Sequence, residues 1–255
     1  MRFTMPKPLH GWREFGGEIA VIMIGVLLAL AAQELLSNFD WGRRVEAGEA
    51  SLRDEATDHS KYFAEQLAVG PCIVAQIDEL EKKVIAPGPL KDVYVYRTWG
   101  PQVIRSPSRT YSRENWNALI ADETLAHLQP QRRLASANYY SQLQSIIDDL
   151  PQTATLQQRL GVLANPISLD SQSRIVFLAD LAQLRDRTIL QTLVATHLLG
   201  QLRDLGRLPQ AAVINEAVAQ SEKDGTVAAC KKRQFPLGDW RAILTAEPVK
   251  KLPGR

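Results

Sequence analysis

The sequence predicts an all-α protein: an N-terminal transmembrane helix that continues into an amphipathic stalk, followed by a periplasmic helical bundle. Three observations predict this. An apolar run, Ile19–Leu36, stands near the N-terminal end of the 255-residue chain. Apolar residues recur at helical spacing through most of the remainder. The chain has two cysteines, Cys72 and Cys230, and both follow the apolar run.

The transmembrane prediction depends on length and on aromatic residues at both ends of the run. The uncharged stretch 19–33 spans about 22 Å as a helix, and residues 15–36 span about 33 Å, against a hydrocarbon core of about 30 Å. Trp12 and Phe15 flank one end, and Phe39 and Trp41 flank the other. Aromatic side chains anchor a helix at both membrane interfaces, so we predict a lipid bilayer as the partner of this segment.

Two other interpretations of the run remain open. Ala29-Leu30-Ala31 is similar to a signal-peptidase site, which would allow cleavage after Ala31, although Glu14 and Glu18 beside the run are unusual for a signal peptide. A buried core helix is the second alternative, but core helices rarely carry so long an uncharged run with aromatic residues at both ends.

One side of the run carries small residues. Gly25 and Ala29 are four apart, and Ala32 continues the same side. Such a face lets two membrane helices approach closely, and it predicts a homodimer through this helix. Ordinary apolar filler explains the same residues equally well.

The cysteines decide the predicted topology, because Lys and Arg are nearly balanced on the two sides of the run. A disulfide between Cys72 and Cys230 requires an oxidising compartment; two separate buried thiols are the alternative. The disulfide places the N-terminus in the cytoplasm and the main domain in the periplasm of a bacterium, anchored in the inner membrane. The predicted parts are a short cytoplasmic tail (1–14), the transmembrane helix (15–36), an amphipathic stalk helix (37–70) and a periplasmic helical domain with an irregular C-terminal tail (71–255).

Proline and glycine set the expected helix ends in the first half of the domain. We expect Gly70-Pro71 to end the stalk helix and a second helix to run over 72–85. Pro87-Gly88-Pro89 ends that helix, and residues 90–111 form a packed loop.

Further helices follow from residue 112. Ser112 is the expected N-cap of one helix, Pro130 starts the next, and Pro151 marks a break or kink. The longest helix is expected over 168–205, capped by Ser168, and a short helix over 209–220 precedes an irregular end. The expected core stripe of the longest helix is Leu190, Val194, Leu198, Leu202 and Leu205.

Composition and motifs assign no catalytic, cofactor or metal residues. A net charge of +2 does not favour nucleic-acid binding, and no catalytic or phosphate-binding motif occurs. Glu55 and His59, like Glu123 and His127, are four apart, which predicts a surface hydrogen bond within a helix rather than a metal site. His197 is expected in the core or at its boundary. Thiol catalysis by Cys72 would require that its sulfur be free.

Two clusters have competing interpretations. Aromatic residues either line a ligand groove or, as we expect, form the core of the bundle: Tyr94, Tyr96, Trp99, Tyr111, Trp116, Tyr139 and Tyr140. Two basic groups either contact acidic headgroups or partners or, as we expect, are solvated charges: Lys231-Lys232-Arg233, and Lys250, Lys251 and Arg255.

The start of the apolar run resembles a group of uncharacterised bacterial single-pass membrane proteins. Residues 17–30 fit G-E-I-x-x-x-x-I-G-V-L-x-A-L, and the stretch from Trp116 to Tyr140 is also similar to proteobacterial members. This chain has Gln33-Glu34 and later Asp40-Trp41 where some members have Asn-Asn-Trp. The resemblance implies an inner-membrane protein and brings no catalytic residues.

These observations predict a membrane-anchored periplasmic helical domain that binds an unknown protein partner or a ligand. Two alternatives remain: an envelope enzyme whose active site follows no known motif, and a dimeric assembly scaffold held together by its membrane helix.

Overall fold

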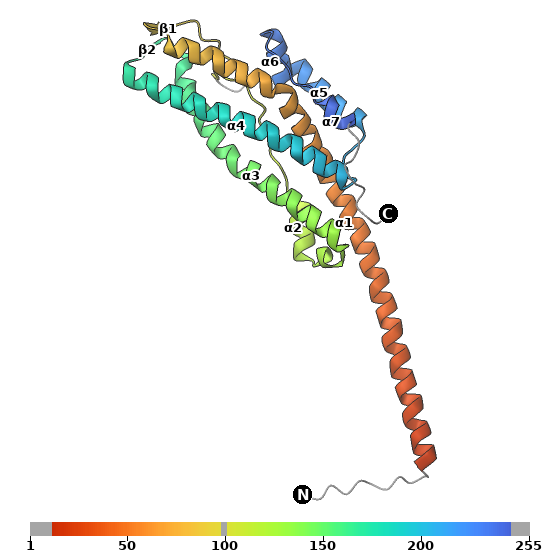
Figure 1. Cartoon of the computed structure of the whole chain (residues 1–255). Helices are drawn as coiled ribbons and strands as arrows, with labels where there is room; N and C mark the ends of the chain where they lie inside the picture. Colours follow the sequence, from red (N-terminus) through yellow and green to blue (C-terminus); the bar gives the residue numbers. More distant parts are fainter. Residues whose placement is uncertain (1–11, 98–100, 246–255) are drawn as a thin grey trace, which may run out of the picture. The chain divides into compact units, whose positions relative to one another are not determined.

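The computed structural model describes residues 12–97 and 101–245, and these are mostly helical (Figure 1). The prediction of an all-α fold is confirmed. Within the described ranges, the only sheet pairs two short antiparallel strands, β1 (Pro89–Leu90) and β2 (Ile167–Ser168). The helices are α1 (Trp12–Ile85), α2 (Glu114–Ala121), α3 (Pro130–Leu160), α4 (Ser171–Asp204), α5 (Ala211–Asp224), α6 (Thr226–Lys232) and α7 (Arg241–Thr245), with short 3-10 helices η1 (Thr124–His127) and η2 (Gly161–Ala164).

The chain divides into two units, one ending at Gly48 and the other beginning at Glu49. In the first unit, α1 is helical from Trp12 onward, and the side chains from Phe15 to Asp40 are exposed. This part of α1 is long enough and apolar enough to cross a membrane, and none of its apolar window is buried. The exposure argues against the alternative of a buried core helix.

In the second unit, α1 continues through Pro71 to Ile85, so the predicted break at Gly70-Pro71 is wrong. Proline has no N–H for the carbonyl four residues earlier, here that of Leu67. The C-terminal segment covers this site: the Gly238 N–H donates to the Ala68 carbonyl oxygen at 2.9 Å. A Cβ on Gly238 would stand 2.2 Å from the Leu67 oxygen, so only glycine fits against it. Figure 1 shows α1 changing direction within this unit.

The same region holds the two cysteines. Cys72 follows Pro71 in α1, Cys230 lies in α6, and their Cα atoms are 5.9 Å apart, a disulfide spacing. Both are buried. The predicted pairing of Cys72 with Cys230 agrees with this separation, and neither sulfur is free in the structure. The pair and the Gly238 contact therefore attach the C-terminal helices to α1 at neighbouring points.

The far end of α1 is held by α4. Helix α1 ends at Ile85, as Pro87-Gly88-Pro89 predicts, and Gly88 has φ +90°, which favours glycine. Arg174 of α4 donates to the carbonyls of Val84, Ala86 and Gly88. The bond to Val84 satisfies a carbonyl that the end of α1 leaves without an intrahelical donor, and the other two bonds hold the turn that follows the helix.

Helices α3 and α4 lie side by side, joined by η2 and β2 (Figure 1). Pro130 starts α3 as predicted, and α3 passes through Pro151 without a break. The predicted cap Ser168 is wrong: α4 begins at Ser171, and the Asp170 side chain accepts from the Ser173 N–H. Asp170 caps α4 because its carboxylate reaches the first free N–H groups of the helix, whereas Ser168 is paired in β2. The longest helix is α1, not the helix predicted over 168–205.

The core of the second unit draws on all three long helices. From Glu49 onward α1 belongs to this unit, and the apolar positions of the predicted stalk, Leu52, Ala56, Phe63 and Leu67, are buried. Residues 90–97 and 101–111 are mostly irregular, apart from short backbone pairings, as expected for a packed loop. Residues 233–240 are irregular before the single-turn helix α7, but the chain is not irregular directly after residue 220, because α5 runs to Asp224 and α6 spans Thr226–Lys232.

Candidate interaction surface

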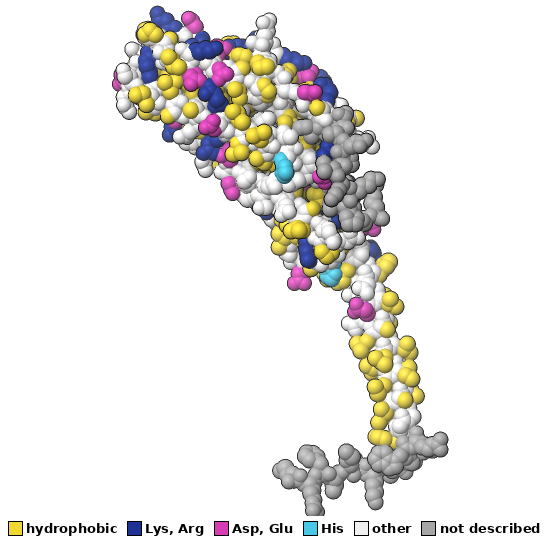
Figure 2. Space-filling view, in the orientation of Figure 1, with side chains coloured by type: hydrophobic (Ala, Val, Ile, Leu, Met, Phe, Trp, Pro, Cys, Tyr) yellow, Lys and Arg dark blue, Asp and Glu magenta, His cyan; other side chains and the backbone are white. Residues whose placement is uncertain are grey.

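Helix α4 carries a row of large apolar side chains on the face that points away from the bundle. Ile175, Leu190 and Leu193 are 60%, 57% and 62% exposed, and Val176 and Ile189 are nearly half exposed. Figure 2 shows hydrophobic side chains along the course of α4. They form two groups, Ile175 with Val176 and Ile189 with Leu190 and Leu193, about 20 Å apart along the helix. Single exposed apolar residues are ordinary, but groups of them on one helix face are typical of a binding surface.

The opposite face of α4 fixes which side chains remain exposed. Leu184, Leu198 and Leu202 are buried against the bundle. Close approach to α1 occurs at Gly70, where a Cβ would stand 2.6 Å from the Thr192 Oγ1 atom. Arg187 pairs with Asp149 of α3. These contacts leave the exposed row of α4 uncovered.

The exposed positions follow the spacing of a coiled-coil seam. Six positions alternate steps of four and three residues, and all six are exposed: Ile175, Ala179, Ala182, Asp186, Ile189 and Leu193. We call these six residues the α4 seam. Steps of four and three keep side chains on one stripe that fits a second helix, knob into hole. The seam is about 27 Å long, and five of its six members are apolar.

The arginines beside the seam form ion pairs with α1 and α3. Arg185 pairs with Asp78 and Glu81 of α1, and Arg187 bonds to α3. The Asp186 carboxylate therefore remains the seam's own charged group. A single polar residue at such a position sets register and direction in a coiled coil.

The burial predicted from the sequence is wrong for part of α4. Of the predicted core stripe, Leu198, Leu202 and Leu205 are buried and Val194 is half-buried, but Leu190 is exposed, so the prediction is wrong at Leu190. His197 was expected in the core or at its boundary and is instead exposed, where it bonds to Gln201. Helix α4 has apolar residues on two sides, and periodicity does not say which side packs.

The Glu55–His59 pair is buried, not a surface hydrogen bond, so that prediction is wrong. His59 is 1% exposed. Its Nε2 lies 2.9 Å from the Ser112 carbonyl oxygen, and its Nδ1 lies 2.8 Å from the Tyr139 hydroxyl. A carbonyl only accepts, so Nε2 carries the proton and the Tyr139 O–H donates to Nδ1. Burial lowers the pKa of His59, which keeps the ring neutral, although the nearby carboxylate of Glu55 acts to raise it.

Glu55 bonds to groups other than His59. Its carboxylate accepts from the Tyr140 hydroxyl at 2.6 Å and from the Ser112 hydroxyl at 3.0 Å. Burial, followed by this bond to Glu55, raises the pKa of Tyr140 far above its ordinary value. The side chains of Glu55 and His59 are both committed to partners inside the bundle. We therefore assign this cluster to holding α1, α3 and the Ser112 loop together.

A second buried polar group lies at the start of the same unit. Glu49 pairs with Arg132 at 3.2 Å and with Arg207 at 3.1 Å, and Arg207 is 1% exposed. Burial acts to raise the pKa of Glu49, but the charges of Arg207 and Arg132 outweigh it and lower the pKa. The triad joins α1 to α3 and to the turn after α4.

The other predicted pair, Glu123 and His127, does not share a helix. Helix α2 ends at Ala121, Glu123 has φ 63°, and His127 ends the 3-10 helix η1. The prediction of a hydrogen bond within one helix is therefore wrong. In the part of the chain that the structure describes, no three His, Cys, Asp or Glu side chains gather as a metal site would require.

The aromatic residues pack as two groups, as the core interpretation predicts. Tyr111 stacks on Phe63, and Trp116 stacks on Tyr140, with ring centroids 5.4 and 4.6 Å apart. Tyr139 and Tyr140 are fully buried. Tyr94 and Tyr96 form a separate group elsewhere, and Trp99 lies outside the described residues.

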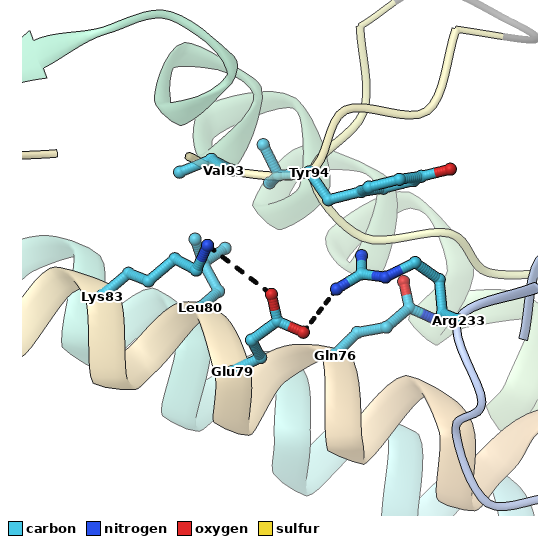
Figure 3. Close-up of a pocket in the computed structure, with 8 residues that line it drawn as sticks. Gln76, Glu79, Leu80, Lys83, Val93, Tyr94 and Arg233 are labelled. Atoms are coloured by element: carbon cyan, nitrogen blue, oxygen red, sulfur yellow. Dashed lines mark hydrogen bonds and ion pairs between the residues drawn. The ribbon is translucent and has the colours of Figure 1, made fainter. Parts of the chain in front are cut away.

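The basic cluster near the C-terminus is only partly solvated. Figure 3 shows Arg233 reaching Glu79, which Lys83 also approaches. The Arg233 guanidinium also stacks over the Tyr94 ring at 4.2 Å. The cavity beside them has a volume of about 10 Å³, enough for about one water molecule. Lys231 pairs with Glu222 and Lys232 is exposed, whereas Lys250, Lys251 and Arg255 lie outside the described residues.

The predicted membrane residues lie on exposed parts of α1. Phe15 and Phe39 are exposed, Trp41 is half-buried, and the Arg44 guanidinium lies over the Trp41 ring at 4.9 Å. The Trp12 side chain lies outside the described residues. The small face of Gly25, Ala29 and Ala32 is also exposed. Anchoring at the interfaces and pairing through the small face stay predictions.

Comparisons with protein-family models, with curated proteins and with solved structures found no match to the chain. The resemblance of residues 17–30 to uncharacterised single-pass membrane proteins therefore stays a prediction. The α4 seam is the surface on which a function can be argued from the chain itself.

Proposed function

We propose that this protein is a membrane-anchored interaction protein whose α4 seam binds a helix of a protein partner. The observation that carries the proposal is the row of exposed apolar side chains at seam spacing on α4. Ile175, Ile189 and Leu193 are each about half exposed or more. Covering one such side chain contributes about 1 kcal/mol to the free energy of binding. A helix that packs against the seam therefore gains binding free energy from each of these side chains.

The anchor in this proposal is the N-terminal part of α1, uncleaved and spanning a bacterial inner membrane. Its exposed apolar side chains and the aromatic residues Phe15, Phe39 and Trp41 support it. The disulfide spacing of Cys72 and Cys230 supports a periplasmic second unit, because the cytosol keeps thiols reduced. The N-terminus is then cytoplasmic.

The test is the mass of the full-length protein extracted in mild detergent, compared between wild type and Leu193→Glu. A charge in place of a side chain that is 62% exposed disrupts the seam without touching the core. We expect association to weaken by about 2 kcal/mol, or about thirtyfold. Ile120→Glu is the matched control, because Ile120 is 52% exposed on α2, away from the seam. Equal masses for wild type and Leu193→Glu would contradict the proposal.

A further inference from the structure

We propose that residues 109–115, the segment that leads into α2, form a strap over α1 that opens when His59 takes up a proton. The inference goes beyond the proposed function, because it concerns a conformational change in a part of the second unit other than the α4 seam. Two observations carry it: side chains in successive turns of α1 hold the strap, and the hydrogen bonds of His59 suit only the neutral ring.

The strap lies along one face of α1. Four residues in successive helical turns form this face: Ser51, Glu55, His59 and Phe63. Asn115 donates from its side chain to the Ser51 carbonyl oxygen at 3.0 Å and from its backbone N–H to the Glu55 carboxylate at 3.3 Å. Ser112 bonds to both Glu55 and His59. The strap is therefore bonded to α1 at three positions, each one turn from the next.

The start of the strap packs on the same region of α1. The Tyr111 ring lies beside the His59 ring and stacks on Phe63, with ring centroids 5.9 and 5.4 Å apart. Arg109 pairs with the Glu65 carboxylate at 2.6 Å. The strap therefore covers the aromatic part of this α1 face.

The strap depends on these contacts because it has no regular backbone pairing. Residues 105–113 form neither helix nor strand, and Arg113 adds a side-chain bond to α3. Segments without buried backbone pairing open at a lower free energy than core helices do. The cysteine pair and the Gly238 contact lie farther along α1, at Cys72 and Ala68, and do not involve the strap. The strap can therefore open while the C-terminal helices stay attached.

The hydrogen bonds of His59 suit the neutral ring. Its Nε2–H donates to the Ser112 carbonyl oxygen, and its Nδ1 accepts from the Tyr139 hydroxyl. A proton on Nδ1 turns this acceptor into a donor, so the Tyr139 O–H loses its acceptor. Within the described residues that hydroxyl bonds to His59 alone, and Tyr139 is fully buried. A buried charge costs free energy, so opening the strap, which admits water to the ring, favours the protonated form.

The titratable groups that face His59 come from α1, the strap and α3. They are Glu55, Asp58, Tyr111, Tyr139 and, behind Tyr139, Tyr140. Burial lowers the pKa of His59 and outweighs the two carboxylates, which act to raise it. An exposed histidine has a pKa of about 6.5. Below about pH 6.5 the open form therefore binds the proton first, and the opening constant rises by up to about tenfold per pH unit until the closed form is also protonated.

The test is brief hydroxyl-radical oxidation of the full-length protein in mild detergent, read by mass spectrometry. Phe63 is fully buried under Tyr111 in the closed form, so its oxidation reports opening of the strap. One bound proton raises the open fraction by up to about tenfold between about pH 7.5 and about pH 5.5, and we expect oxidation of Phe63 to rise by at least about threefold. Leu202, fully buried in α4, should be oxidised equally at both pH values.

Two variants connect the response to His59. Glutamine supplies a donor and an acceptor but does not titrate, so His59→Gln should remove the rise in Phe63 oxidation. Tyr139→Phe removes the hydroxyl that favours the neutral ring, so opening should begin at a higher pH than in the wild type. His197→Gln, at an exposed histidine of α4, is the matched control and should respond like the wild type.

Three results would overturn the inference in different ways. Equal oxidation of Phe63 at both pH values in the wild type would mean that the strap does not open. A rise in His59→Gln as large as in the wild type would assign the response to another group. A rise at Leu202 together with Phe63 would mean that the whole unit unfolds. None of these results bears on the α4 seam, so the proposed function is tested separately.

Discussion

Replacing Gly238 with alanine is expected to destabilise the second unit by about 2–3 kcal/mol. The new Cβ would stand 2.2 Å from the Leu67 carbonyl oxygen and 3.4 Å from the Pro71 Cδ atom. The C-terminal segment must then move away from the proline site. Its bond to the Ala68 carbonyl is worth about 1 kcal/mol net, and leaving that buried carbonyl short of a donor adds up to about 2 kcal/mol. Ala68 is fully buried, so water does not replace the donor.

The assay is thermal unfolding of the full-length protein in detergent, followed by circular dichroism without reductant. A loss of this size lowers the midpoint by about 4–12 °C in a unit of this length. Gly200→Ala is the control: Gly200 lies inside α4, and the nearest atom to its new Cβ is 4.0 Å away. That change is expected to leave stability unchanged or raise it by up to about 1 kcal/mol. An unchanged midpoint for Gly238→Ala would refute the role given to the C-terminal segment.

Three further predictions concern the buried polar groups and the cysteine pair. Burial lowers the pKa of His59, so the folded chain binds fewer protons than the unfolded chain below about pH 6.5. Stability is therefore lost as the pH falls from 6.5 through the folded pKa, and His59→Gln should reduce this loss in urea titrations at several pH values. Reducing the bond between Cys72 and Cys230 is expected to lower the free energy of unfolding by about 5 kcal/mol in the chain-entropy model, measured by urea titration with and without reductant. Glu49→Gln leaves the buried Arg207 without its carboxylate and is expected to cost about 3 kcal/mol, whereas Gln in place of the exposed Glu46 should change stability by less than about 0.5 kcal/mol.

Local sequence signals predicted the features that depend on neighbouring residues. The end of α1 before Pro87, the start of α3 at Pro130 and the irregular loop before Ser112 all follow from backbone constraints within a few residues. Pro71 shows the limit of such signals. Helix α1 continues through it, and the segment that packs there comes from far along the chain: Gly238, 167 positions later, donates to the neighbouring Ala68 carbonyl, and nothing near Pro71 indicates that contact.

The partners of the buried polar residues and the exposed face of α4 were harder to predict for a related reason. Glu55 and His59 do share a helix face, but their partners Tyr139 and Tyr140 come from α3, 80 and 85 residues away. On α4 the step pattern of the seam is visible in the sequence. The buried face also carries leucines, however, and only the packing against α1 and α3 decides which set stays exposed.

The most direct test of the central claim, an uncleaved membrane anchor that carries an oxidised periplasmic unit, is the intact mass of membrane-purified protein. The protein is alkylated with and without prior reduction. We expect the full-length chain, with Cys72 and Cys230 alkylated only after reduction. A chain that begins after Ala31, or one whose two thiols are alkylated before reduction, would contradict the claim.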